Sequence, residues 1–439
     1  MSLRDEGTER DTAGRSVGKE MYAWATDLFP ICRSLTGNGV RETLAYLKRI
    51  VPSLESHEVP SGTRVLDWIV PDEWNIRDAY VLDERGVRVI DFREHNLHVV
   101  NYSEPVDVTL DLDELQAHLH SLPGRPDTIP YITSYYERRW GFCLADSRRR
   151  ALAPGRYRAV VDSTLEPGAL TYGEIVLPGR EAGEVFLSTY VCHPSLANNE
   201  LSGPVVATAL ARWISALPDR RYTYRIVFAP ETIGAITYLS RHLDHLRRHV
   251  VAAFNMTCVG DDRAYSYLAS RAGDTLADRV AVHVLGHLAP GFVRYSFLDR
   301  HSDERQYCAP GVDLPMATMM RTAYGRYPEY HTSEDDLTVI SPDGLSGAYE
   351  VLRHCLLALE GNDTLRTTTI GEPQLGRRGL MSTLGHGPTR SGPGRRRLAN
   401  LLAYSDGTRD LLGIAELTGE PIWDLFDAAA LLRREGLLA

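Results

Sequence analysis

The feature that most constrains the fold is an alternation of apolar strand patterns with helical patterns between residues 185 and 321. Continuous apolar runs of strand length recur, and a helical pattern follows each of the first three. Parallel strands need a long crossover, usually a helix, so this rhythm predicts a parallel α/β sheet covered by helices. The expected strands span residues 185–191, 224–229, 250–256 and 315–321, and the expected helices span residues 202–217, 234–246 and 275–288.

Two other segments of the chain have sequence patterns that differ from this α/β alternation. Short alternating runs in residues 67–166 predict an inserted β-rich module, interrupted by one helix over residues 112–122. Residues 366–397 contain seven arginines and one acid among many Gly and Pro residues, which indicates a basic linker. Three short helical patterns follow and resemble a winged-helix unit, expected to be all helical. These patterns span residues 397–404, 411–418 and 421–434.

These segments predict three domains, which agrees with a length of 439 residues. An α/β domain comprises residues 17–66 and 167–365, with helices over 17–29 and 39–50, and residues 1–17 are expected to be disordered. The inserted module comprises residues 67–166. The basic linker and winged-helix-like unit comprise residues 366–439.

Composition limits the partners and the compartment. A net charge of -10 argues against a protein that coats nucleic acid, so any such role must be local to the C-terminal unit. Six scattered cysteines without a C-x-x-C pair favour a reducing compartment. The N-terminus lacks an apolar signal region and no window is long and apolar enough for a membrane span, so we expect a cytoplasmic protein. A homo-oligomer is possible.

Polar residues follow the expected strands where ligand sites form in open α/β sheets. His193, Asn199 and Glu200 follow the first strand, Glu231 follows the second, and His331 lies in a late aromatic loop. Neutral imidazole suits zinc, and partial burial would raise the pKa of Glu231 and make it a useful base. Each residue also has a structural alternative: a strand-end histidine is more often structural than ligating, and Glu231 could cap a helix.

Other patterns carry less weight. His283 and His287 have the i, i+4 spacing of a zinc pair, but no H-E-x-x-H glutamate lies between them. The sequence has no G-x-S-x-G elbow and no Walker A motif, which disfavours a serine hydrolase and a nucleoside triphosphatase.

Four ordered motifs resemble the bacterial aminopeptidase-like proteins with an inserted module and a C-terminal winged helix. The proteins of that family are distantly similar to zinc exopeptidases such as leucyl aminopeptidases and glutaminyl cyclase. The resemblance implies a mixed sheet flanked by helices, with an inserted β-rich module. The motifs are His193-Pro-Ser-Leu-Ala-Asn-Asn-Glu-Leu-Ser-Gly203, Pro230-Glu-Thr-Ile-Gly234, Ser302-Asp-Glu-Arg-Gln-Tyr307 and Glu329-Tyr-His-Thr-Ser333.

The same resemblance implies a metal site with fewer acids than those exopeptidases use. By motif order His193 and His331 match metal-binding histidines and Glu231 matches the general base, whereas Asn199, Thr232 and Thr257 replace carboxylate ligands. We therefore expect one zinc per chain, held by His193, Glu200 and His331, with Asn199 as a substitute ligand.

This set predicts a zinc-dependent amide hydrolase that acts on a peptide or a small amide-containing metabolite. Asp303 is expected to orient a ligand histidine, and other side chains are candidates for gripping the substrate or the developing oxyanion. These candidates are Arg305, Arg321, Arg326 and Tyr330. Two alternatives remain open: a ligand-sensing regulator whose helical domain binds DNA, and a non-catalytic scaffold.

Overall fold

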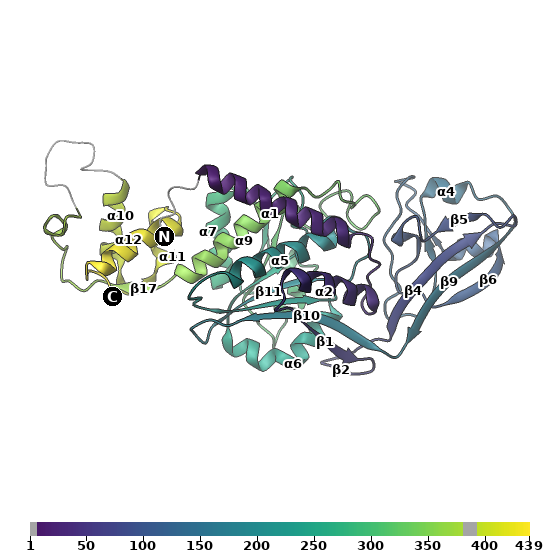
Figure 1. Ribbon diagram of the computed structural model, residues 1–439, viewed down its shortest axis with the longest axis horizontal. Helices are drawn as coiled ribbons and strands as arrows, with labels where there is room; N and C mark the ends of the chain where they lie inside the picture. The colour runs from purple at the N-terminus through teal and green to yellow at the C-terminus, as the bar shows by residue number, and fades with distance from the viewer. Residues whose placement is uncertain (1–6, 381–392) are drawn as a thin grey trace. The chain divides into compact units, whose positions relative to one another are not determined.

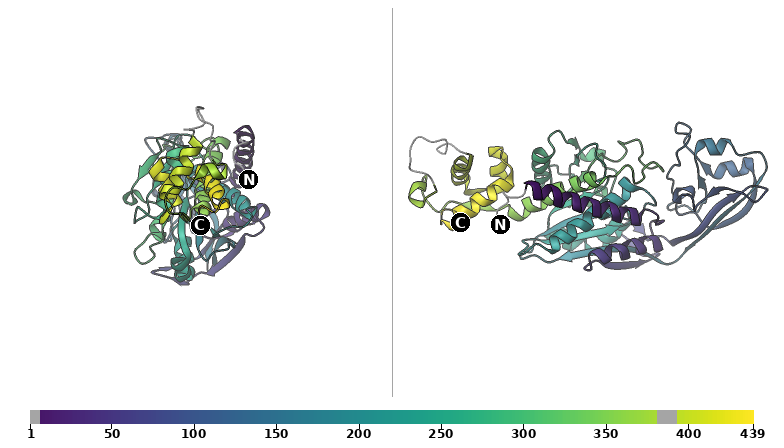
Figure 2. Two further views of the ribbon diagram at one scale, coloured as in Figure 1. Left: turned by 90° about the vertical axis from the view of Figure 1, so that its left-hand side faces the viewer. Right: turned by 45° about the horizontal axis from the view of Figure 1, so that its top comes forward.

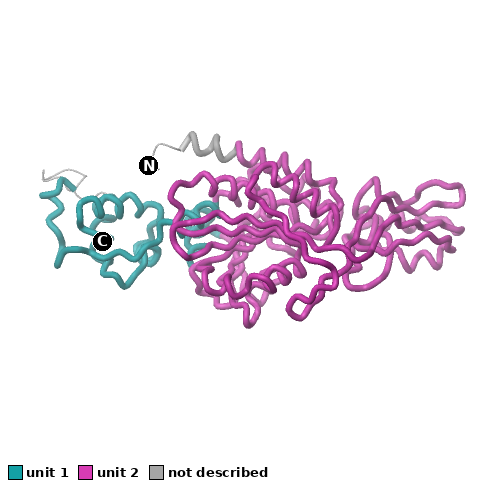
Figure 3. Tube along the Cα trace, turned by 60° about the horizontal axis from the view of Figure 1, so that its bottom comes forward, with its two compact units in different colours: residues 1–10, 279–291, 351–439 teal, residues 11–278, 292–350 magenta. Residues whose placement is uncertain are grey.

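The computed structural model describes residues 7–380 and 393–439 and divides into two compact units (Figure 3). The larger unit comprises residues 11–278 and 292–350. The smaller unit comprises residues 1–10, 279–291 and 351–439. Within the described ranges no helix is long and apolar enough to cross a membrane.

An eight-stranded mixed sheet forms the centre of the larger unit (Figure 1). Its order is β1-β10-β12-β11-β13-β16-β14-β15, and the four middle strands β12, β11, β13 and β16 run parallel. Because both faces of these strands are covered, they consist of continuous apolar runs rather than alternating ones. The eight strands are β1 (Glu55–Pro60), β10 (Ala169–Leu177), β11 (Glu184–Tyr190), β12 (Thr223–Ala229), β13 (Val250–Met256), β14 (Ser266–Leu268), β15 (Val293–Tyr295) and β16 (Met316–Met320).

Helices α2 (Asn38–Ile50) and α5 (Ser202–Ser215) cover one face of this sheet and α6 (Ile233–His249) covers the other (Figure 1). On the α6 side, Ile233, Ile236 and Leu239 pack against Phe186 of β11 and Val227 of β12 in a fully buried cluster.

The start of α5 lies unusually close to the strands. A Cβ atom on Gly203 would come within 2.2 Å of the Thr189 hydroxyl and 2.7 Å of the Met256 carbonyl oxygen. Glycine at this position therefore lets the preceding loop, which carries Asn199 and Glu200, sit directly over the strand ends.

The inserted module has its own four-stranded antiparallel sheet, β5-β4-β9-β6. Its inward side chains form a separate core that includes Ala79, Val81, Ile90, Phe142 and Val161. The strands are β4 (Glu73–Leu82), β5 (Arg88–Asp91), β6 (Val106–Asp111) and β9 (Arg156–Glu166). The predicted helix over residues 112–122 is wrong in extent: α3 (Leu112–Leu115) gives way to a 3-10 turn and the short strand β7 (Leu119–His120).

Smaller elements complete the larger unit. They are β2 (Arg64–Val65), β3 (Trp68–Ile69), β8 (Phe142–Cys143), α4 (Asp146–Arg150), α8 (Glu304–Tyr307), a π-type turn η3 (Ala197–Leu201) and 3-10 turns η1 (Asn96–His98), η2 (Gln116–His118) and η4 (Phe297–Asp299).

In the smaller unit, α10, α11 and α12 pack against one another (Figure 2). The strands β17 and β18 form an antiparallel ribbon that the helical periodicity did not predict, so this region is not all helical. The elements are α10 (Pro393–Tyr404), β17 (Thr364–Arg366), β18 (Asp406–Asp410), α11 (Leu411–Thr418), α12 (Ile422–Arg434) and η5 (Leu375–Arg378), together with parts of α7 (Leu276–Leu288) and α9 (Pro342–Gly361).

The N-terminal segment differs from the expected disorder. Helix α1 (Gly7–Leu28) already begins at Gly7, because each residue added to an existing helix gains a backbone hydrogen bond even where the sequence is polar. Residues 1–6, and residues 381–392 of the predicted linker, lie outside the described residues.

Candidate active site

The loops that carry the candidate residues leave the same edge of the central sheet. β11 ends at Tyr190, three residues before His193, and its parallel neighbour β12 ends at Ala229, two residues before Glu231. In an open α/β sheet the carboxyl ends of adjacent parallel strands form the usual ligand crevice. His331 comes from the separate loop between β16 and α9.

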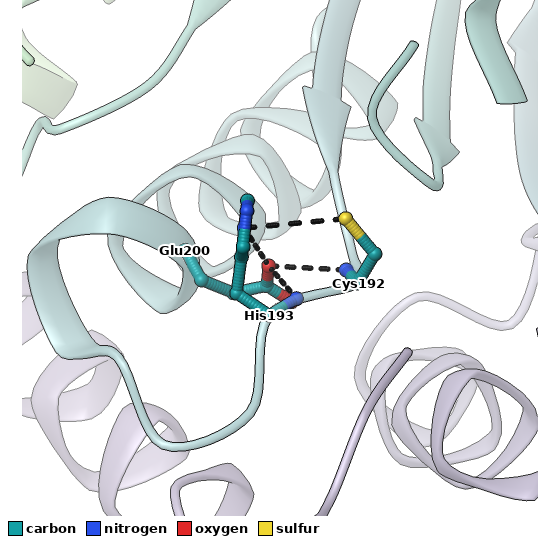
Figure 4. Close-up of side chains that lie close together, drawn as sticks. All are labelled: Cys192, His193 and Glu200. Carbon is teal, nitrogen blue, oxygen red and sulfur yellow. Dashed lines mark hydrogen bonds and ion pairs between the residues drawn. The ribbon is translucent and has the colours of Figure 1, made fainter. Parts of the chain in front are cut away.

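Glu200 fixes the orientation of the His193 imidazole (Figure 4). Its Oε2 atom lies 3.0 Å from His193 Nδ1 and also accepts the backbone N–H groups of Cys192 and His193 at 3.0 and 2.6 Å. Its Oε1 atom lies 2.9 Å from Arg33 Nε, and both side chains are fully buried. These distances assign the proton to Nδ1, so Nε2 is the nitrogen of His193 that remains for another partner.

The arginine also decides what this cluster can bind. Within the described residues, one group of three potential metal-ligand atoms lies within 4.8 Å of one another: Cys192, His193 and Glu200. The predicted set of His193, Glu200 and His331 is not such a group. The permanent charge of Arg33 next to Glu200 opposes a divalent cation there, and burial raises the pKa of the Cys192 thiol and keeps it neutral. The geometry therefore suits Glu200 to orienting His193 rather than to binding metal directly.

Glu231 lies directly in front of His193. One of its carboxylate oxygens is 3.6 Å from His193 Nε2, and 23% of the side chain is exposed. Burial raises the pKa of Glu231, although the nearby charges of His193 and Arg305 act in the opposite direction. The predicted direction of this shift is confirmed, and it places the pKa of the carboxyl closer to the range in which it can exchange protons near neutrality.

Asp303 supports the turn that carries Glu231. It was expected to orient a ligand histidine, but its Oδ1 atom instead accepts the backbone N–H of Thr232 at 2.7 Å. Asp303 directly precedes the short helix α8, and Thr232 has a strained positive φ of 64°. Arg305 donates from Nη2 to the Thr232 hydroxyl at 2.9 Å. Burial and the charge of Glu231 raise the pKa of Asp303.

His331 meets Asn199 on the other side of the site. Its Nε2 atom is 2.9 Å from Asn199 Oδ1, and its ring centroid is 5.6 Å from that of His193. Tyr330 stacks on the His331 ring at 3.9 Å. Burial and the charge of His193 lower the pKa of His331 to about 3, so the imidazole is neutral and can act as a ligand.

A network of hydrogen bonds surrounds Asn199. Its amide nitrogen donates to the Tyr190 hydroxyl at 2.6 Å, and that hydroxyl lies 2.5 Å from the hydroxyl of Thr257. Asp335 accepts the backbone N–H groups of Asn198 and Asn199 and holds this loop in place. Thr257 therefore contributes a neutral hydrogen bond at the end of β13.

Two of the predicted substrate-binding arginines are turned to other partners. Arg321 is buried, with its guanidinium carbon 3.7 Å from the centre of the Tyr265 ring. Arg326 is exposed and lines a cavity of about 140 Å³ together with Tyr295, His301 and Tyr324. The structure therefore brings Arg305 and Tyr330 to the candidate site, whereas Arg321 and Arg326 face other partners.

Sequence reasoning missed Tyr131, which belongs to the inserted module. Its half-buried ring makes edge-to-face contacts with His193 and His331, at centroid distances of 5.1 and 5.2 Å. No motif surrounds this tyrosine. A contact between an inserted segment and residues that lie 60 to 200 positions further along the chain leaves no local periodic signal.

The fold and the strand-end site define an aminopeptidase-like protein. A zinc aminopeptidase from Bacillus subtilis has the same fold, with a TM-score of 0.57, 12% identity and coverage of 78% of this chain and 94% of that one. An aminopeptidase from Aneurinibacillus matches with a TM-score of 0.51 and 13% identity, covering 78% of this chain and 93% of that one.

The chain belongs to the family described as Domain of unknown function (DUF4910), which matches residues 22–362. Residues 363–439 match a winged helix-turn-helix family. A relative from Clostridium acetobutylicum, named for polysaccharide biosynthesis and an aminopeptidase-like domain, is 44% identical over 423 residues and covers 96% of each chain. A crystal structure from that organism, described as a candidate peptidase, has a TM-score of 0.92, 42% identity and 99% coverage of each chain.

Proposed function

We propose that this protein is an amide hydrolase that uses one zinc ion, with Glu231 as the general base. The observation that carries the proposal is the 3.6 Å approach of the Glu231 carboxylate to His193 Nε2, while Glu200 occupies the other nitrogen of the ring. A histidine held by a carboxylate on one nitrogen is the usual arrangement of a zinc ligand.

The residues present fit a single zinc ion. Two imidazoles bound to one tetrahedral zinc through nitrogens at about 2.0–2.1 Å have ring centroids roughly 5 Å apart, and those of His193 and His331 are 5.6 Å apart. Asn199 Oδ1, which lies 2.9 Å from His331 Nε2, supplies a third donor. We therefore propose His193, His331 and Asn199 as ligands and give Glu200 the task of positioning His193.

Zinc would supply a Lewis acid that polarises the amide carbonyl and acidifies water. Glu231 accepts a proton on its carboxylate during attack by water and delivers it to the leaving amine. Its raised pKa suits both transfers. Asp303 holds the Thr232 N–H, and Arg305, whose charge acts on Glu231, can receive a negatively charged part of the substrate.

The substrate class is a small amide. The name of the Clostridium relative associates that protein with polysaccharide biosynthesis, so N-acylated sugars belong in a test panel with aminoacyl amides and N-acyl amino acids. Each of these contains the amide bond that the proposed chemistry cleaves.

Metal content is the direct test. We expect about one zinc per chain in the wild type and in Glu231→Gln, and none in His193→Ala. The matched control is His242→Ala, which removes a histidine from α6, on the face of the sheet opposite α2 and α5. This variant should retain zinc. Glu231→Gln should lower hydrolysis by at least about 10²-fold, because the base is lost while the metal remains. A wild type that binds no zinc after supplementation would overturn the proposal.

A further inference from the structure

The inserted module takes part in the candidate active site. Asn101 of the module accepts a hydrogen bond from Ser34 at 2.5 Å and donates to the Arg33 carbonyl oxygen at 2.8 Å. Arg33 is the residue that pairs with Glu200 and donates from Nε to the carbonyl oxygen of His193. Module contacts thus reach the first histidine through its supporting residues.

A second set of contacts joins the module to the loop of the other histidine. The Tyr131 N–H donates to the His331 carbonyl oxygen at 2.9 Å, and Ser333 exchanges two hydrogen bonds with Ile129 at 2.8 and 3.0 Å. Arg125 pairs with Glu334, three residues further along the same loop. His331 has a positive φ of 55°, a conformation that non-glycine residues keep only when their surroundings impose it.

Tyr131 lies between these two sets of contacts. Its ring meets the His193 imidazole at 77° and the His331 imidazole at 90°, so one rigid ring contacts both. Its hydroxyl is directed to the Tyr135 hydroxyl, 3.0 Å away, and so belongs to the module's own hydrogen bonds. The ring, rather than the hydroxyl, is therefore what faces the histidines.

We infer that Tyr131 is a positioning residue that sets the separation of His193 and His331, so that the inserted module completes the metal site. The inference rests on the proposed single-zinc site. Because side chains that hold metal ligands typically change metal affinity 10–100-fold when they are replaced, loss of the ring should weaken zinc binding by about tenfold or more.

Zinc affinity of the full-length protein, measured by competition with a chelator, tests this inference. Tyr131→Ala and Tyr131→Leu should both bind zinc at least about tenfold more weakly, whereas Tyr131→Phe should stay within about twofold of the wild type. Leucine fills much of the space, so this variant separates loss of the spacer from loss of folding. Tyr136→Ala is the control, because this half-exposed tyrosine of the same segment packs on Trp68.

The visible absorption spectrum of bound Co²⁺ gives a second measurement that a purely structural residue would not change. We expect an altered spectrum in Tyr131→Leu and an unaltered one in Tyr136→Ala and Tyr131→Phe. If wild type and Tyr131→Leu bind zinc equally well, the inference is wrong while the proposed function stands. A loss in Tyr131→Phe as large as in Tyr131→Leu would also refute the role of the ring. Absence of zinc from the wild type would instead refute the proposed function.

Discussion

A buried carboxylate between an arginine and a histidine determines what each of the three groups can do. Glu200 neutralises Arg33 on one side and orients His193 on the other, so none of the three groups acts independently. A carboxylate placed in this way has no need of a metal ion to balance its charge. The consequence is that the anion needed at the reacting centre has to come from Glu231.

Replacing Glu200 tests this dependence. Glu200→Gln leaves the Arg33 guanidinium buried without its counter-charge, which should lower the free energy of unfolding by about 3–5 kcal/mol in denaturant titrations. Asp107→Asn, which removes the partner of the exposed Arg158, is the matched control and should leave the unfolding midpoint unchanged. Similar midpoints for the two variants would contradict the importance of the buried pair.

The pH dependence of hydrolysis reports on Glu231. A base must be ionised to accept a proton, so activity should fall as the pH drops through its pKa, and burial moves that pKa above the ordinary 4.5. Arg305 acts to lower this pKa, so Arg305→Gln should shift the acid limb of kcat/KM to higher pH. Arg300→Gln, at an exposed position, should not shift it. An acid limb that moves to lower pH in Arg305→Gln would refute the assignment.

For individual residues of the candidate site, the sequence predicted which side chains lie close together but not all of their roles. His193, Glu231 and His331 were found because strand ends and motif order mark them, and the structure brings them together. The role of Glu200 depends on Arg33, which lies 167 positions earlier and belongs to no motif. Hydrogen-bond partners of that kind are set by tertiary packing, which one sequence does not display.

Among the elements, buried parallel strands were the easiest to predict. β11, β12, β13 and β16 match the expected runs closely, because strands covered on both faces consist of uninterrupted apolar residues. The short strands β14 and β15, the last two in the order of the sheet, have three residues each, too few for any periodicity to emerge. The predicted helix after Leu112 failed for a related reason: apolar residues at helical spacing also fit a short helix followed by a strand.

Helix α12 is attached to its neighbours through histidines. His283 Nε2 accepts the N–H of Ile422 at 3.0 Å, which requires the neutral ring, and the Trp423 ring lies 4.9 Å from that of His354 and 5.9 Å from that of His287. Burial lowers the pKa of His283 from 6.5 to about 4, helped by the charges of His287 and Arg279.

Acidification should therefore loosen α12. A pKa that is lower in the folded than in the unfolded state means that the unfolded chain binds the proton first, so stability is lost as the pH falls from about 6.5 to about 4. The loss should reach at most about 3 kcal/mol, and Trp423 fluorescence would report it. His283→Gln, whose amide oxygen still accepts a hydrogen bond, should show a shallower pH dependence. Equal slopes in both proteins would contradict the prediction.

For the whole molecule, the open question is whether the winged helix-turn-helix region binds DNA. In such proteins the N-terminal residues of the recognition helix contact bases in the major groove. Here the corresponding end of α12 carries Asp424 and Asp427 and packs on histidines of α7 and α9. Arg397 is already paired with Glu420 and Asp424.

We therefore expect no specific DNA binding. A fluorescence anisotropy titration with duplex DNA should show at most weak association that disappears between 50 and about 200 mM salt, because few phosphate contacts are available. Tight binding that is lost in Arg395→Ala/Arg396→Ala would contradict this expectation and favour the regulator over the hydrolase. The matched control is Arg148→Ala, which changes an exposed arginine in the inserted module.

The contact between Tyr131 and the two histidines has a consequence for biosynthesis of the chain. The module's four strands lie between Glu73 and Glu166, so all of them leave the ribosome before His193 and long before His331. Domains generally fold as units during synthesis, with the N-terminal ones first. The Tyr131 ring is therefore synthesised before His193 and His331, and the two histidines pack against a ring that is already present.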